Sequence, residues 1–227
     1  MHALRYATIS AAAILAISLS VNLTRAYSAD VPNLPDPAVD IKDEKGPQTA
    51  VFAGGCFWCT EAVFEQLKGV TKVVSGYAGG SKESAKYNLV SSGGTQHAES
   101  IQIHYNPSQI TYGQLLKVFF AVAHDPTTLN YQGPDHGYQY RSAIFYSNDE
   151  QKRVAEAYVK QLTDVKAFSK PIVTKISALP AFYPAEDYHQ DFVKLNPNHP
   201  YVVVNARPKL KKLKDHFPEL LKTKPKS

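Results

Sequence analysis

The sequence predicts an α+β fold in which helices cover one face of a mixed β-sheet. Short apolar, partly β-branched runs of strand length alternate along the chain with longer segments whose apolar residues recur at helical spacing. In chain order these elements run β-α-β-β-α-β-α-β, a pattern typical of a sheet sandwiched with helices. With 44% hydrophobic residues, the chain can bury an ordinary core, and its length fits one domain with additional segments.

Residues 1–29 resemble a secretory signal peptide. Arg5 supplies a positive start, residues 7–21 a short apolar stretch, and small residues follow at Ala26, Ser28 and Ala29. Cleavage after Ala26 or Ser28 would leave a soluble protein in an exported, oxidising compartment, periplasmic or secreted, without stable membrane association. The alternative is an uncleaved membrane anchor, although a spanning helix usually needs about 20 apolar residues.

Residues 30–47 form a proline-rich, acidic linker or arm with no sustained period. We expect one domain over residues 48–227, ending in a basic tail. Much of the formal net charge of +5 comes from lysines in that tail. We interpret them as a solvated end and predict no nucleic-acid function.

The first expected strand, residues 49–53, leads through Gly54-Gly55 into a helix that begins at Cys56 and stops at Gly69. The glycine pair permits a sharp turn with positive φ. Within the helix, Cys59 falls on the apolar face. At the first turn the unpaired N–H groups and the helix dipole favour the thiolate of Cys56. We expect Glu61 to complement the same helix N-terminus and leave it outside the site.

A second strand is expected over residues 71–77, followed by a polar, irregular segment over 81–94. Strict alternation predicts a half-buried strand over 99–105. Helical spacing over 111–123 predicts a helix with Thr111 as a candidate cap.

A long polar loop, residues 124–137, precedes a strand over 141–146. Asn148 or Asp149 caps a helix that runs to about Leu162. A further strand is expected over 172–176 and a short helix over 183–195. We interpret the whole as a two-layer sandwich of the ferredoxin-like plait type.

The Cys56-x-x-Cys59 pair has several interpretations. The spacing at the start of a helix is that of a thioredoxin-like redox pair. Zinc would need two further ligands from dispersed histidines, and covalent haem attachment needs a histidine where Thr60 stands. A purely structural disulfide across so short a loop would constrain little chain entropy. These comparisons favour redox chemistry and no metal.

The surroundings of the pair suggest a small substrate. Phe57 and Trp58, between the cysteines, form an aromatic wall that suits an apolar methyl group. Glu99 ends the segment Gly93-Gly-Thr-Gln-His-Ala-Glu99 at the start of a strand. Asp135 and Tyr140 lie in a second segment that leads into another strand.

Six motifs, in this order along the chain, closely resemble those of the A-type peptide methionine sulfoxide reductases. The resemblance runs from about Thr49 to Leu221. The motifs are Gly54-Gly-Cys-Phe-Trp-Cys-Thr-Glu61, Gly76-Tyr-Ala-Gly-Gly80, His97-Ala-Glu99, His124-Asp-Pro-Thr127, Gln139-Tyr-Arg-Ser142 and Ala185-Glu-Asp-Tyr-His-Gln190.

The resemblance implies reduction of the S epimer of methionine sulfoxide, free or within proteins. By motif, Cys56 would be the nucleophile and Glu99 a protonated acid that donates to the sulfoxide oxygen, helped by the hydroxyls of Tyr87 and Tyr140. Phe57 and Trp58 would hold the substrate methyl, and Asp135 would bind the methionine backbone. His189 also resembles a family position, and we expect a structural role for it.

The chain departs from many members of this family, which carry glycine where Cys59 stands and have recycling cysteines in a C-terminal tail. Cys59 is the only second thiol in this sequence, so a Cys56–Cys59 disulfide is expected, recycled by a thioredoxin-like protein or another dithiol. We expect a monomer with no bound cofactor. The alternative is an exported thiol–disulfide oxidoreductase, or a redox-regulated binding module.

Overall fold

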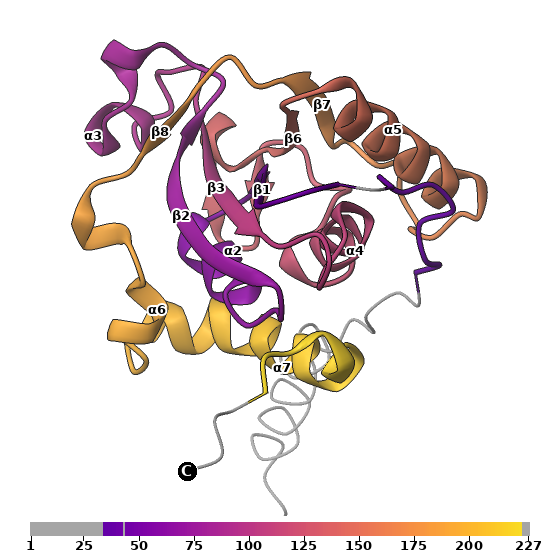
Figure 1. Cartoon of the computed structure of the whole chain (residues 1–227). Coiled ribbons are helices and arrows are strands. Elements are labelled where there is room, and N and C mark those ends of the chain that lie inside the picture. The colour runs from indigo at the N-terminus through magenta and orange to yellow at the C-terminus, as the bar shows by residue number, and fades with distance from the viewer. Residues whose placement is uncertain (1–33, 43, 224–227) are drawn as a thin grey trace, which may run out of the picture. The chain divides into compact units, whose positions relative to one another are not determined.

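The computed structural model describes residues 34–42 and 44–223, so the expected signal peptide lies outside the described residues. Its centre is a six-stranded mixed sheet with the strand order β7-β6-β1-β3-β2-β8 (Figure 1). Only β6 and β7 pair in parallel in this sheet; its other neighbouring strands are antiparallel. The α+β prediction is confirmed in this form.

The strands are β1 (Gln48–Gly54), β2 (Val70–Ala78), β3 (Ala98–Tyr105), β4 (Tyr131–Gln132), β5 (Asp135–His136), β6 (Ser142–Tyr146), β7 (Lys175–Ala178) and β8 (Phe182–Pro184). The α-helices are α2 (Phe57–Phe64), α3 (Tyr87–Val90), α4 (Tyr112–Val118), α5 (Asp149–Asp164), α6 (Phe192–Leu195) and α7 (Arg207–His216). Shorter helical turns are η1 (Lys82–Ser84), η2 (Phe119–Ala123), η3 (Tyr138–Tyr140), η4 (Asp187–His189), η5 (Val202–Ala206) and η6 (Pro218–Leu220).

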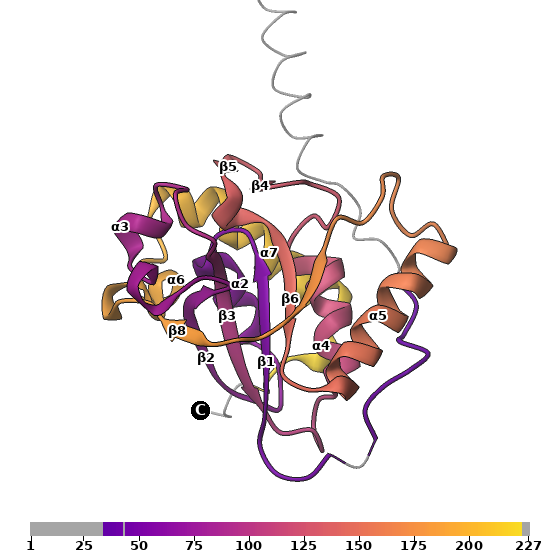
Figure 2. The ribbon, with the colours of Figure 1, turned by 90° about the horizontal axis from the view of Figure 1, so that it is seen from above.

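The two faces of the sheet are covered differently. On one face, the ring of Phe52 in β1 lies 5.0–6.0 Å from the rings of Phe64, Tyr112 and Phe119, which come from α2, α4 and η2. On the other face, apolar side chains of β1, β2, β3 and β6, mostly alanines, pack against Leu179 and Phe182. Figure 2 shows the segment between β7 and β8 crossing the sheet there. The helices α2 and α4 and the turn η2 therefore pack together on one face of the sheet.

The helix caps confirm two expectations. Thr111 forms a capping box with Gln114 at the start of α4, and the side chain of Asn148 accepts a hydrogen bond from the Gln151 N–H at the start of α5. Both caps satisfy backbone donors that have no partner within the helix.

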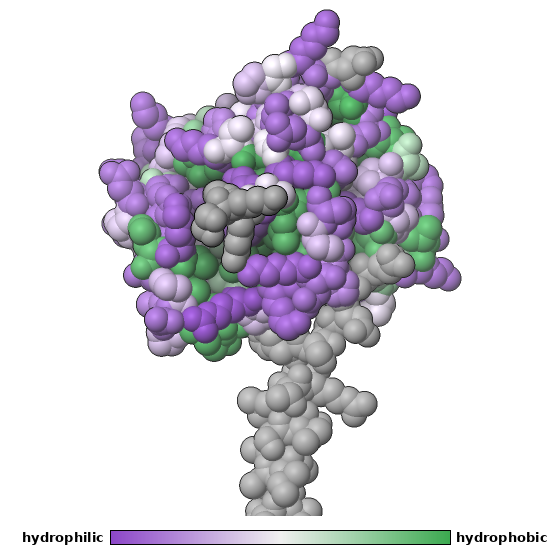
Figure 3. Space-filling view, turned by 60° about the horizontal axis from the view of Figure 1, so that its bottom comes forward, coloured by the Kyte–Doolittle hydropathy of each residue, from purple (hydrophilic) through white to green (hydrophobic). Residues whose placement is uncertain are grey.

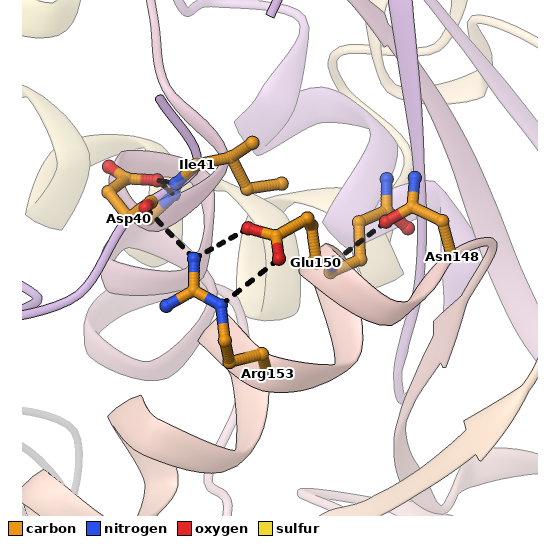
Figure 4. Close-up of polar contacts among 7 residues, drawn as sticks. Asp40, Ile41, Asn148, Glu150 and Arg153 are labelled. Atoms are coloured by element: carbon orange, nitrogen blue, oxygen red, sulfur yellow. Dashed lines mark hydrogen bonds and ion pairs between the residues drawn. The ribbon is translucent and has the colours of Figure 1, made fainter. Parts of the chain in front are cut away.

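The arm before β1 packs against α4 and α5. Leu34 is buried, and the carboxylate of Asp40 accepts hydrogen bonds from the Thr111 hydroxyl and the Gly113 N–H. A Cβ at position 113 would lie 2.6 Å from that carboxylate, so only glycine leaves room for it. Figure 4 shows Arg153 of α5 between Glu150 and the backbone oxygen of Asp40. The composition of this segment did not reveal these contacts.

Several element predictions were wrong. The expected strand over 172–176 begins later, at Lys175. The expected helix over 183–195 is instead an edge strand, β8, followed by the short turns η4 and α6, because residues 182–184 pair with β2. The first helix ends at Phe64, before the expected stop at Gly69. Part of the expected basic tail folds as α7. No helix among the described residues is long and apolar enough to cross a membrane.

Candidate active site around Cys56

The turn between β1 and α2 positions Cys56. Gly55 has φ +85°, and a Cβ there would lie 2.6 Å from Gln132. A Cβ at Gly54 would lie 3.1 Å from both His124 and Phe119. Two glycines therefore let the chain turn tightly against its neighbours, as predicted. Cys56 is the N-cap residue of α2 and is 8% exposed.

Glu99 lies directly beside this helix start. Its carboxyl accepts a hydrogen bond from the Phe57 N–H at 3.1 Å, from β3 across to the first turn of α2. The side chain is 2% exposed. Burial raises the pKa of Glu99 to about 8, with a further increase from Asp135 and Cys59, against the lowering effect of the Phe57 N–H. The carboxyl is therefore mainly protonated at neutral pH, which a proton donor requires.

Two tyrosines lie within electrostatic range of Glu99 and Cys56. Tyr87 begins α3 and Tyr140 ends η3. Burial raises the pKa of both phenols, and the nearby Glu99 and Cys56 raise them further. Both hydroxyls are thus protonated donors within electrostatic range of the buried acid and the thiol. The structure brings together four of the residues that the sequence singled out.

The expected thiolate at Cys56 is a wrong prediction. Burial raises the pKa of this thiol well above its ordinary value, and the neighbouring Cys59 and Glu99 raise it further. The dipole argument failed because the Phe57 N–H points to Glu99 and not to sulfur. Cys56 is therefore held as a thiol next to a protonated carboxyl.

Cys59 is 1% exposed and is a free thiol, as Cys56 is. Both cysteines belong to one apolar cluster. Burial and the interaction with Cys59 raise the pKa of Cys56, whereas the interaction with Cys56 lowers the pKa of Cys59.

Asp135 lies in β5, and its carboxylate accepts a hydrogen bond from the hydroxyl of Tyr201. Burial raises the pKa of Asp135, while Tyr201, Lys209 and His136 lower it. Tyr201 also lowers the pKa of both cysteines. The sequence reading missed Tyr201, because it follows a Pro-Asn-His-Pro segment that carries no periodic signal.

An aromatic cluster holds Trp58. Its indole ring stacks on Phe192 with 3.7 Å between ring centroids, and Tyr201 meets it edge-on at 5.8 Å. Its Nε1–H donates to Nδ1 of His189 at 3.0 Å. Phe57 is 1% exposed and lies 4.9 Å from the ring of His189. The predicted aromatic wall therefore exists and also includes Phe192, which the sequence reading missed.

The segment around His189 supports these side chains. His189 contacts the rings of Phe57, Trp58 and Tyr87, in keeping with the structural role expected for it. The carboxylate of Glu186 accepts hydrogen bonds from the Tyr77 hydroxyl at 2.8 Å and the Tyr87 N–H at 2.9 Å. One irregular segment thus ties α3 to the sheet and fixes the position of Tyr87.

Glu61 does not complement the N-terminus of α2, contrary to expectation. The first turn of that helix contains no acidic residue, and Glu61 is 2% exposed further along it. Burial raises the pKa of Glu61 to about 8, helped by Glu65, while the Asp191 N–H lowers it. It is a buried acid on α2 whose neighbours include Glu65, Asp191 and Ser75. Among the described residues there is no group of histidine, cysteine and acidic side chains that would hold a metal.

The geometry suits transfer of an oxygen atom to sulfur. A buried thiol, a protonated carboxyl and two phenols converge beside an aromatic wall, with a second thiol in contact with the first. A sulfoxide is a poor electrophile until its oxygen is protonated, so a positioned acid next to a nucleophilic sulfur matches that need.

Comparison with known proteins agrees with this chemistry. The family model for peptide methionine sulfoxide reductase matches residues 48–221. The peptide methionine sulfoxide reductase MsrA 2 of Mesorhizobium japonicum is 56% identical over 187 residues, which cover 82% of this chain and 96% of that protein. The MsrA 2 of Synechocystis is 55% identical, over 83% of this chain and 90% of that protein.

Two solved structures are also similar. Reduced Mxr1 from Saccharomyces cerevisiae aligns with a TM-score of 0.61 at 33% identity, over 71% of this chain and 92% of that one. Methionine sulfoxide reductase A of Corynebacterium diphtheriae aligns with a TM-score of 0.58 at 32% identity, over 74% and 85%. This chain therefore belongs to the peptide methionine sulfoxide reductase family and is an enzyme of the A type.

Proposed function

We propose that this enzyme reduces the S epimer of methionine sulfoxide, free and in oxidised proteins, by way of a Cys56 sulfenic acid and a Cys56–Cys59 disulfide. The observation that carries the proposal is the buried carboxyl of Glu99, hydrogen-bonded to the Phe57 N–H beside Cys56 and protonated at neutral pH. Such an acid next to a thiol suits a substrate that must receive a proton.

In the first step, Glu99 donates a proton to the sulfoxide oxygen, supported by the hydroxyls of Tyr87 and Tyr140. The sulfur of Cys56 attacks the sulfoxide sulfur, and the thiol proton passes to the Glu99 carboxylate, which restores the acid. The hydroxyl group then moves to Cys56 as the S–S bond to the substrate and the S–O bond of the substrate break, so one thiol and one sulfoxide become one sulfenic acid and one thioether. The aromatic wall of Phe57 and Trp58 binds the substrate methyl, and Asp135 binds the methionine backbone.

In the second step, the sulfur of Cys59 attacks the sulfenic acid of Cys56, forming the disulfide and releasing water. The packing of both cysteines in one apolar cluster supports this pairing. A thioredoxin-like protein or another dithiol then reduces the disulfide. The cycle needs no bound metal or organic cofactor.

The alternative is a thiol–disulfide oxidoreductase, which uses the same Cys-x-x-Cys pair. The family match over residues 48–221 argues against this alternative. The aromatic wall of Phe57 and Trp58 beside Cys56 also suits a substrate methyl group. The site therefore favours sulfoxide reduction.

We further propose export of the protein to a periplasmic or extracellular compartment after removal of residues 1–29, with 30–47 as an arm and 48–227 as the catalytic domain. The apolar stretch near the N-terminus supports export. We also propose a monomer with no stable membrane association after cleavage. The finer fold type is a two-layer ferredoxin-like plait, supported by the central strand order β6-β1-β3-β2.

A single-turnover assay tests the proposed function. Pre-reduced protein is mixed with separated S or R methionine sulfoxide without reductant, and methionine and remaining thiols are counted. We expect one methionine per enzyme from the S epimer only, with both thiols lost. No methionine from either epimer would refute the proposal and favour disulfide exchange.

A further inference from the structure

Cys59 is more deeply buried than Cys56. It is 1% exposed, whereas Cys56 is 8% exposed. Both belong to an apolar cluster that includes Ala206 of η5 and is covered by Leu210 of α7. An external dithiol therefore reaches Cys56 more readily than Cys59, and the choice of sulfur depends on such access.

Lys209 lies between Ala206 and Leu210 in the sequence, and its side chain also points into the protein. Its Nζ donates to the backbone oxygen of Ala123, at the end of η2, at 2.6 Å. Among the described residues no carboxylate lies within ion-pair distance of this ammonium. By contrast Lys211, on the same helix, is exposed and pairs with Asp215. Figure 3 shows the mainly hydrophilic surface on the side of the molecule that carries α7.

The charged and titratable groups around Cys59 are few. The interaction with Cys56 lowers the pKa of Cys59 most, the ammonium of Lys209 and Tyr201 lower it too, and burial and Asp135 raise it. Glu99 also lies within electrostatic range of Cys59.

Lys209 itself faces Asp135, Lys212 and His124 besides Cys59. Burial lowers the pKa of His124 to about 3, so this imidazole is neutral at physiological pH. The only positive charges in this set are those of Lys209 and Lys212, and Lys209 is the one that acts on Cys59.

We propose that Lys209 is a positioning residue for the second half of the catalytic cycle, where its ammonium stabilises Cys59 as a buried thiolate. This inference rests on the proposed function. The thiolate of Cys59 attacks the sulfenic sulfur of Cys56, the S–S bond forms, and the hydroxide that leaves takes up a proton to become water.

The same charge acts again when the disulfide is opened. A thiolate of the donor dithiol attacks the more exposed sulfur, Cys56, and Cys59 leaves as a thiolate beside Lys209. The second thiol of the donor then releases Cys56, so that the donor is oxidised and both cysteines are reduced. A stabilised leaving thiolate leaves faster.

The test compares Lys209→Met, Lys209→Arg and the surface control Lys211→Met in rapid-quench single turnovers with methionine S-sulfoxide across pH 5–9. Methionine release reports the first step and loss of thiols reports the second. In Lys209→Met we expect the ratio of the thiol-loss rate to the methionine-release rate to fall roughly tenfold at pH 7. The pH profile of thiol loss should also move to higher pH. Lys209→Arg should restore the ratio, and Lys211→Met should match wild type.

Each other result overturns the inference. An unchanged ratio in Lys209→Met refutes it. A lower ratio with an unmoved pH profile shows that Lys209 only caps the end of η2. If wild type itself releases no methionine, the proposed function is refuted, and the role of Lys209 is refuted with it. A single-cysteine thioredoxin gives a second measurement: it should form a mixed disulfide with Cys56 of oxidised wild type, and attachment to Cys59 would contradict the inference.

Discussion

Replacing Glu99 by glutamine should make the protein more stable and much less active. The amide has nearly the same shape and its oxygen still accepts the Phe57 N–H, so the site stays formed. It has no acidic proton to donate to a sulfoxide. Loss of a positioned general acid typically costs about 10²–10⁴-fold in rate.

The gain in stability follows from the pKa of the buried carboxyl, which burial raises from 4.5 to about 8. At pH 7 the unfolded chain carries this group ionised and the fold carries it mainly protonated. Folding therefore takes up a proton, at a cost of about 3 kcal/mol. Because the folded state binds more protons, wild-type stability falls as pH rises from about 4.5 to about 8. The glutamine variant is free of this cost.

Urea unfolding of wild type and Glu99→Gln between pH 4 and pH 9 measures the difference. The variant should be more stable by up to about 3 kcal/mol at pH 7 and equally stable near pH 4. Glu61→Gln is a matched control, because burial also raises the pKa of Glu61 to about 8 outside the proposed site. It should gain comparable stability and keep its single-turnover rate. The reasoning is refuted if Glu99→Gln gains no stability at pH 7, or if its rate equals that of wild type.

Two further substitutions test the scaffold. His189→Phe keeps the ring contacts but leaves the Trp58 N–H without its acceptor. The free energy of unfolding should therefore fall by about 1–3 kcal/mol, and KM should rise. An unchanged KM would show that His189 does not contribute to substrate binding. Asn148→Ala removes the cap of α5 and should lower the free energy of unfolding by about 1 kcal/mol. Its kcat/KM at 25 °C should equal that of wild type. A loss of activity would show that α5 affects the active site.

The sequence predicted the elements whose signal is local. The glycine pair before Cys56, the caps Thr111 and Asn148 and the alternating strand at Glu99 all depend on nearby residues. Burial of Glu99 and its raised pKa were expected from the chemistry that the site must perform.

What failed depends on contacts distant in sequence. Residues 182–184 form a strand only because β2 offers a free edge, and composition alone suggested a helix. Tyr201 and Lys209 reach the site because η5 and α7 fold back onto α2. The thiolate prediction for Cys56 failed because desolvation and the partner of the Phe57 N–H are tertiary features. Local pattern determines elements, whereas the electrostatics of a buried site depend on the whole fold.

The most direct test of the central claim is to identify the chemical state of Cys56 after one turnover with methionine S-sulfoxide. Wild type and Cys59→Ser are quenched with a sulfenic-acid reagent, digested and analysed by mass spectrometry. The account predicts a Cys56–Cys59 cross-linked peptide in wild type and a labelled Cys56 sulfenic acid in Cys59→Ser, each with one methionine released. A labelled Cys56 in wild type without the cross-link would contradict Cys59 as the resolving thiol, and an unmodified Cys56 after methionine release would contradict the mechanism.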